Sequence, residues 1–231
     1  TVAELLGHRE FRVRYLATRE LASRDRTQAI QAVNTWIDTL GDEDPRRARS
    51  LAEGMAWLST LDAVRPEVLV ELAADDDHHA RAAAIRQLRY WHEALPDRHE
   101  ILFRAATDPS GLVRMEAAIA ASWIGTQEAL DAVLSIFRQP IGGHLAYAAV
   151  CALESSPLQR HWRNDQDSIA PALLHRARRS LEIQEPKAKG KDREFDRSPE
   201  TVEIRISCEP ERMLFTNKQF TVRPGQPVKL V

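Results

Sequence analysis

Small and apolar side chains recur at the spacing of one helix face through most of this chain. One such stripe consists of Val113, Ala117, Ala120 and Ile124. Residues three, four and seven positions apart lie on the same side of an α-helix, so the stripe predicts a helix with one buried face. Further apolar segments at 66–73 and 128–137 predict the second helices of helical hairpins. The pattern therefore predicts paired helices and an all-α fold class up to about residue 183.

The helical pattern repeats with a period of about 33 residues. Segments 10–21, 44–55, 76–88 and 108–121 align so that one arginine of each stands in register: Arg14, Arg49, Arg81 and Arg114. A fifth copy at 142–153 keeps the phase but has Tyr147 at the arginine position. A helical hairpin of this length cannot bury its own apolar face, so neighbouring hairpins must stack. We therefore expect an α-solenoid.

Each repeat opens on a residue that forms turns or caps helices, such as Asp44, Asp75 or Asp108. Because Asp75 and Asp108 lie six residues before Arg81 and Arg114, we favour a structural role for the arginines. In that role each arginine pairs with an aspartate or a loop carbonyl of a neighbouring repeat. The alternative is a basic ladder that grips nucleic-acid phosphates. A net charge of -2, from 32 basic and 34 acidic residues, disfavours a nucleic-acid partner.

The repeat signature is more specific than helical periodicity alone. The ankyrin and tetratricopeptide patterns are missing, whereas Asp108-Pro109 is followed by Val113-Arg114 and then by Ala117. This Asp-Pro, Val-Arg-x-x-Ala pattern resembles the HEAT repeat family in its short bacterial form. The resemblance covers roughly residues 1–183 and implies an α-solenoid of HEAT-type hairpins.

The composition changes abruptly at Gln184. Residues 184–199 are rich in charge and almost free of apolar side chains, which predicts an exposed linker. Beyond it, apolar residues alternate with polar ones from Thr201, as in a half-buried strand. A second strand is expected at Phe220–Val222, a turn at Pro224 and Gly225, and a further strand from Val228. The expected domains are therefore 1–183, 184–199 and 200–231.

The C-terminal segment carries a second resemblance. Residues 201–231, with "FTVRPGQPVKLV" at their end, resemble the N-terminal strands of azurin- or plastocyanin-like cupredoxins. The resemblance implies copper ligands beyond Val231, so Cys208 and Met213 are assigned no ligand role. Because the chain starts within an apparent helix and stops on a strand, we expect a piece of a longer protein with a truncated β-sandwich.

The order of these segments resembles the middle of large bacterial dehydrogenase-like proteins, which combine a β-propeller, HEAT repeats, a cupredoxin and a haem c module. This resemblance implies a non-catalytic scaffold or spacer within an extracytoplasmic redox protein, periplasmic or at the cell surface. It implies copper as a cofactor of the longer protein, with haem c as a further candidate, and neighbouring domains and redox proteins as partners. The alternative is a protein-interaction solenoid followed by an Ig-like β domain, with no redox role.

Candidate chemistry within the chain itself is sparse. Adjacent histidines on a helix point about 100° apart, so His78 and His79 are expected to be solvated or capping residues, and so are His92 and His161. The five tryptophans are expected to fill gaps between repeats. The sequence has no nucleophile elbow, HExxH, phosphate loop or dinucleotide turn, and no apolar run that could span a bilayer. We therefore assign no catalytic, metal-binding or cofactor-binding residue and expect no enzymatic activity.

Overall fold

The computed structural model describes residues 1–184, 198–204, 206 and 220–230. Contacts within the chain divide it into two units, Thr1–Gln184 and Glu185–Val231, and each unit is described by itself. The linker predicted at 184–199 lies almost entirely outside the described residues.

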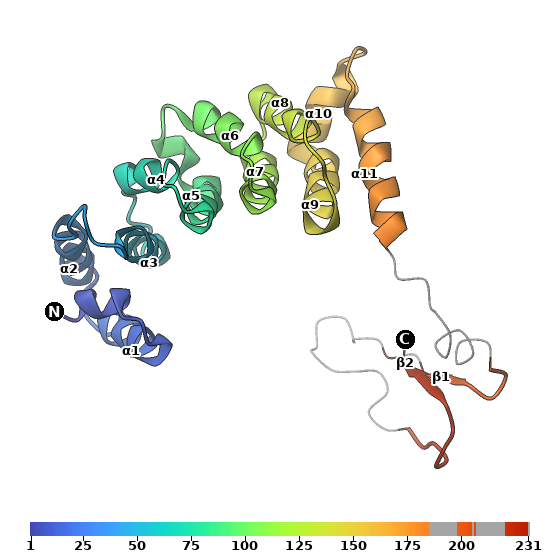
Figure 1. Cartoon of the computed structure of the whole chain (residues 1–231), viewed down its shortest axis with the longest axis horizontal. Helices are drawn as coiled ribbons and strands as arrows, with labels where there is room; N and C mark the ends of the chain where they lie inside the picture. The colour runs from blue at the N-terminus through green and yellow to red at the C-terminus, as the bar shows by residue number, and fades with distance from the viewer. Residues whose placement is uncertain (185–197, 205, 207–219, 231) are drawn as a thin grey trace. The chain divides into compact units, whose positions relative to one another are not determined.

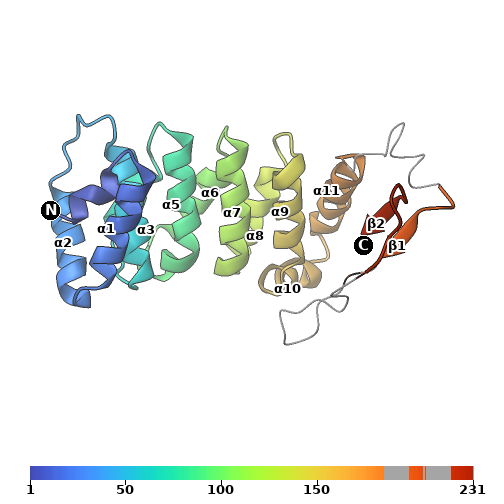
Figure 2. The ribbon, with the colours of Figure 1, turned by 90° about the horizontal axis from the view of Figure 1, so that it is seen from below.

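The first unit is an array of helices in two layers (Figure 1). The inner layer, on the concave side of the array, consists of α1 (Phe11–Ala22), α3 (Arg47–Thr60), α5 (His78–Trp91), α7 (Gly111–Ile124), α9 (Gly143–Glu154) and α11 (Ala170–Gln184). The outer layer consists of α2 (Arg26–Asp38), α4 (Pro66–Leu72), α6 (Arg98–Ala106), α8 (Gln127–Ile136) and α10 (Ser156–Asn164). Short 3-10 helices are η1 (Ala3–Gly7) and η2 (His92–Ala94). Figure 2 shows the inner helices side by side, so the predicted all-α solenoid of stacked hairpins is confirmed.

The core runs without interruption between the two layers. All four residues of the predicted stripe on α7 are buried: Val113, Ala117, Ala120 and Ile124. Alanines make up about half of the core residues on the inner helices, and their small side chains allow neighbouring helices to pack closely. The stripe therefore marks the core face, as its spacing predicts.

The tryptophans divide into two groups. Trp36, Trp57 and Trp91 are buried, and Trp162 is partly buried and donates a hydrogen bond from Nε1 to Leu153 O at 2.7 Å. Trp123 instead lies exposed at the C-terminal end of α7. The prediction that all five tryptophans fill gaps between repeats is therefore wrong for Trp123, whose helical position points away from the core.

Aspartates organise the loops that lead into three inner helices. The side chains of Asp44, Asp75 and Asp108 each accept a hydrogen bond from the backbone N–H two residues later, at 2.8 to 2.9 Å. The cap of α5 is Asp77, whose Oδ1 accepts from the N–H of His79 at 2.9 Å. The repeated aspartate therefore shapes the loop before the helix, as Asx turns do, and does not itself cap the helix.

Gly125 lies between α7 and α8 of the fourth hairpin, and its carbonyl group contacts the fifth hairpin. It ends α7 with a positive φ of 64°, a conformation that costs other residues strain energy. Its carbonyl oxygen lies 3.0 Å from Arg160 Nη2 and 3.0 Å from His161 Nε2, both on α10. A Cβ atom at this position would stand 2.7 Å from Pro157 Cβ. Backbone conformation and space thus both require glycine here.

The second unit contains two short strands, β1 (Val202–Ile204) and β2 (Val228–Leu230), which pair in parallel with Val202 opposite Val228. The Pro224–Gly225 turn is present: Gln226 N donates to Arg223 O at 3.0 Å, and Gly225 has a φ of 81°. The prediction of a strand at Phe220–Val222 is wrong, because these described residues form no strand. An alternating pattern supplies a suitable face, but a strand also needs a neighbouring strand to bond with.

Candidate interaction surface

Arg81 joins two loops on one edge of the array. Its Nη1 donates to the carbonyl oxygens of Asp75 and Asp76, both at 2.9 Å, in the loop that leads into α5. Its Nε and Nη2 donate to the two carboxylate oxygens of Asp108 at 2.7 and 3.0 Å, in the loop that leads into α7. Burial alone would raise the pKa of Asp108, but hydrogen bonds from Arg81 and from the Ser110 N–H lower it below its usual value.

Arg114 repeats this arrangement one hairpin later with a neutral partner. Its Nη1 donates to Asp108 O at 2.6 Å and Pro109 O at 2.9 Å behind it, and to Gln139 Oε1 at 2.8 Å ahead. Arg114 is only 6% exposed, and its Nε has no hydrogen-bond partner among the described residues. The carboxylate that Arg81 finds in Asp108 is thus replaced by an amide.

In the second repeat the equivalent residue is Arg47, not the predicted Arg49. Arg47 Nη1 donates to Leu40 O in the preceding loop, and its Nε and Nη2 donate to the Glu71 carboxylate at 2.8 and 3.2 Å. Arg49 is exposed. With Arg47 in place of Arg49, the arginines of the four repeats are also more evenly spaced along the sequence.

Arg14 closes the series at the first repeat. Its Nη1 donates to His8 O and Arg9 O at 2.9 and 3.1 Å, and its Nε lies 3.1 Å from Glu53 Oε1 on α3. We call Arg14, Arg47, Arg81 and Arg114 the arginine series. Their guanidinium groups are bonded to loop carbonyls and side chains of the array, so the series holds the loops in place.

The exposed side of the inner helices forms a separate surface, which we call the inner face. From α3 to α9 its exposed side chains include Arg49 on α3, Arg86 and Tyr90 on α5, Trp123 on α7, and Tyr147 and Cys151 on α9. On α5 the exposed positions 79, 86 and 90 follow helical spacing, which places them on one side of the helix.

Two aromatic residues meet at the C-terminal ends of α5 and α7. Tyr90 and Trp123 are 57% and 56% exposed, and their rings pack edge to face with centroids 5.3 Å apart. The Arg89 guanidinium lies 5.7 Å from the centre of the Tyr90 ring. Trp123 follows Tyr90 by one repeat period. A search for aromatic residues one period apart in the sequence could therefore have identified the pair.

Glu116 is a buried carboxylate between α5 and α7. It is 2% exposed, and its oxygens accept from Arg86 Nη2 at 2.6 Å and Arg89 Nη2 at 2.7 Å. Two guanidinium groups share one carboxylate, so the cluster keeps a net positive charge next to the inner face. The sequence signal was a lone acidic residue within the apolar run of α7, which indicates a buried partner of opposite charge.

A hollow of about 530 Å³ opens between α7 and α9 on the inner face. Its lining is mostly apolar and includes Met115 and Ile119 from α7 and Tyr147 and Cys151 from α9. Tyr147 is 63% exposed at its rim, and a hydrogen bond with Cys151 raises the pKa of Tyr147. None of the described residues that line this hollow is acidic or an arginine, so it suits an apolar side chain.

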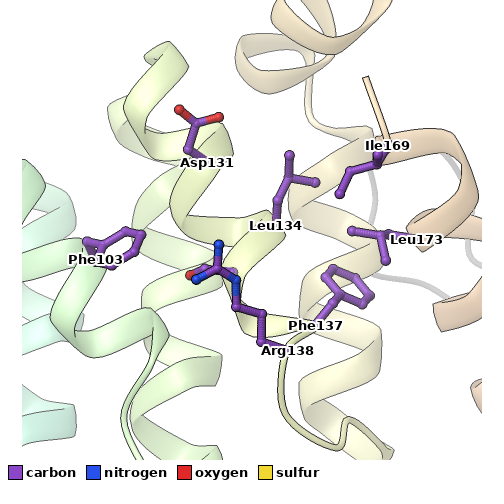
Figure 3. Close-up of a pocket in the computed structure, with 8 residues that line it drawn as sticks. Phe103, Asp131, Leu134, Phe137, Arg138, Ile169 and Leu173 are labelled. Atoms are coloured by element: carbon purple, nitrogen blue, oxygen red, sulfur yellow. The ribbon is translucent and has the colours of Figure 1, made fainter. Parts of the chain in front are cut away.

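A second hollow of about 370 Å³ lies between α6, α8 and the start of α11 (Figure 3). Leu134, Phe137 and Leu173 gather at one side of it, and Phe103 stands at the other. Asp131 and Arg138, from α8 and the turn that follows it, add charge of either sign to its lining. It is smaller than the hollow on the inner face, and its lining mixes apolar side chains with both charges.

The histidines give no catalytic arrangement among the described residues. The ligand atoms of Asp77, His78 and His79 lie within 4.8 Å of one another, and the two imidazole rings are 4.1 Å apart. The two rings therefore lie close together, although adjacent helical residues diverge by about 100°. All three residues are exposed, while His161 binds the Gly125 carbonyl. Cys208 and Met213 lie outside the described residues.

Comparison with known proteins matches one family to the middle of the chain. The model of HEAT repeats matches residues 66–154, from α4 through α9. No curated protein and no solved structure matches the chain. Among the described residues, none of the helices has the length and apolar character needed to cross a membrane. The matched segment contains Arg81, Arg114 and the stacked hairpins around them, and the first unit is an α-solenoid of HEAT-type helical hairpins.

Proposed function

We propose that the helical array binds a protein partner across its inner face and acts as a non-catalytic scaffold. The observation that carries this proposal is the set of Tyr90, Trp123 and Tyr147, each more than half exposed on three successive inner helices. Tyrosine and tryptophan are enriched among the residues that dominate protein interfaces, and helical-repeat arrays use their concave surfaces for binding. The match to HEAT repeats supports the same role, because these repeats commonly mediate protein interactions.

Site-specific photo-crosslinking tests this proposal. A benzophenone amino acid replaces Tyr147 on the inner face, or Val70 on outer helix α4 as a control of comparable accessibility. The full chain is then irradiated in an extract of the organism that encodes it. We expect one protein to be crosslinked from Tyr147 and, in a second variant, from Trp123, but not from Val70. Equal crosslinking from Val70, or none from the inner face, would exclude the proposed function.

We also propose a finer role, supported only by the resemblance of residues 201–231 to cupredoxin strands. In this role the array spaces or docks redox domains of an extracytoplasmic protein, and a copper site lies in the part of the β domain that follows Val231. Of the expected elements, the Pro224–Gly225 turn and the strand from Val228 are present, whereas the strand at Phe220–Val222 is not. The sequence encoded beyond Val231 tests it: a Cys, His and Met cluster is expected there, and its absence would remove the copper role.

A further inference from the structure

We infer that the inner face receives an acidic segment of a partner protein that carries an apolar anchor residue. This inference rests on the proposed function and names the chemistry of its partner. The acidic part of the segment lies over α3 and α5, and the anchor enters the hollow between α7 and α9. The Tyr90–Trp123 pair lies between these two regions.

The charges of α3 and α5 carry the first half of this inference. Arg49 is exposed on α3, and no hydrogen bond or ion pair of its side chain is found among the described residues. Nearby Glu53 is already paired with Arg14. On α5, Arg86 and Arg89 share Glu116, which leaves one positive charge, and the Arg86 side chain is largely exposed. This part of the inner face is therefore basic although the chain as a whole is slightly acidic.

Two helices of the outer layer show the opposite balance. The acidic residues of α4 and α8 are Glu67, Glu71, Glu128 and Asp131, and the sequence of neither helix contains a lysine or arginine. Glu67 and Glu71 are paired with Arg65 and Arg47, so the unpaired acidic charge is that of α8. An acidic segment is therefore favoured on the inner side of the array over α8. This asymmetry orients the encounter even though the net charge is small.

The hollow between α7 and α9 carries the second half. Its volume of about 530 Å³ falls within the range of side-chain and ligand pockets, about 300 to 1,000 Å³. Met115 and Ile119 line it, and methionine adapts its flexible side chain to irregular apolar partners. Since the described lining holds no acidic or arginine residue, a leucine, isoleucine, methionine or phenylalanine is the side chain that gains most from entering it.

A single-stranded nucleic acid is the competing occupant, because exposed aromatic residues beside arginines can also stack bases. Two observations favour the protein segment. The guanidinium groups of the arginine series are bonded within the array, so these four cations are not free for phosphates. Bases stack on flat ring faces, whereas the hollow is a recess between two helices.

Peptide selection tests the inference with the intact chain. Random peptides displayed on phage are selected on the immobilised protein, and the selected peptides are synthesised with a fluorophore for anisotropy titrations. We expect them to be rich in Asp and Glu around one large apolar residue, and to bind more weakly as salt increases. Replacing that apolar residue by Ser should weaken binding by about tenfold or more.

Matched charge reversals locate the contact. Arg49→Glu on the inner face should weaken binding of the acidic peptide by about tenfold, whereas Arg104→Glu on outer helix α6 should leave it within about twofold. Cys151→Glu, an exposed change that places a negative charge at the hollow, should weaken binding by a similar factor. Circular dichroism of each variant shows that the helical array is retained.

Three results would overturn the inference. The first is selection of neutral or basic peptides, the second is equal loss of binding in Arg49→Glu and Arg104→Glu, and the third is tighter binding of a labelled oligothymidine that displaces the peptides. In the first two cases crosslinking from Tyr147 can still identify a protein partner, so the proposed function would stand while the acidic partner would not. Absence of crosslinks from the inner face would exclude both.

Discussion

Arg81 and Asp108 form a two-pronged ion pair between two loops of the array, with Nε to Oδ2 at 2.7 Å and Nη2 to Oδ1 at 3.0 Å. The same guanidinium also binds two carbonyl oxygens of the preceding loop. A planar guanidinium can serve both loops at once because its N–H groups point in fixed, divergent directions. Arg47 and Arg114 make related links in the neighbouring hairpins.

Replacing the guanidinium group of Arg81 by an ammonium group should lower the stability of the helical array. Arg81→Lys cannot keep both the bidentate pair and the two carbonyl bonds, so we expect the free energy of unfolding to fall by about 1 to 3 kcal/mol. Arg47→Lys should have a similar effect. Urea denaturation followed by far-ultraviolet circular dichroism, which reports helix content, measures both.

Arg49→Lys is the matched control, because Arg49 is exposed and stands two residues from Arg47. Its effect should stay within about 0.5 kcal/mol. If Arg49→Lys destabilised the chain more than Arg47→Lys did, the assignment of Arg47 to the arginine series would be contradicted.

Stability should depend on the ionisation of Asp108. The folded state lowers the pKa of this carboxyl, so its contribution is complete above the unfolded pKa of about 3.9 and is lost as the pH falls through the lower folded value. We expect Asp108→Asn to be less stable than the native chain at pH 6, with a difference that shrinks below about pH 4. Chemical denaturation across this range measures the difference, and a gap that did not change with pH would argue against it.

Glu116 should be the most sensitive carboxylate of the inner layer. In Glu116→Gln one amide N–H₂ faces a guanidinium, and Arg89 is left partly buried without a counter-charge while exposed Arg86 can turn to solvent. We expect a loss of about 2 to 3 kcal/mol. Glu100→Gln, on the exposed surface of α6, is the control and should change stability by less than about 0.5 kcal/mol. Similar losses in both variants would rule out the buried cluster.

Gly125 should not tolerate even one methyl group. Gly125→Ala forces an L-residue into a positive φ and places its Cβ 2.7 Å from Pro157 Cβ, which together should cost about 2 to 4 kcal/mol. Gly41→Ala is the matched control, because its φ is not positive and no heavy atom of the described residues lies within 4 Å of where its Cβ would stand. Thermal melts of the two variants should therefore differ by several degrees.

Much of the array could be predicted from the sequence. Segments 66–73 and 128–137 correspond to α4 and α8, and the stripe of α7 is buried as its spacing requires. Periodicity succeeds here because every hairpin has the same task, which is to cover the apolar faces of its neighbours.

The candidate site could be predicted only in part. The segment around Arg46, Arg47 and Arg49 offers three arginines, and an approximate repeat period cannot choose among residues so close together. Exposure of Trp123 depends on which side of α7 faces α9, which a count of tryptophans does not give. The strand expected at Phe220–Val222 needed a pairing partner, and alternation along one segment carries no information about partners.

The arginine series also restricts where insertions and deletions can occur in homologous proteins. Arg81 and Arg114 each bind carbonyls five and six residues before themselves, so one residue inserted between carbonyl and arginine would break the bond in that repeat. Homologous chains should therefore conserve the length of the loops before α5 and α7. In the fifth repeat buried Ala146, not Tyr147, holds the position that Arg81 and Arg114 occupy as fourth residues of their helices. The loop before α9 is therefore free of this constraint and should be where insertions and deletions accumulate.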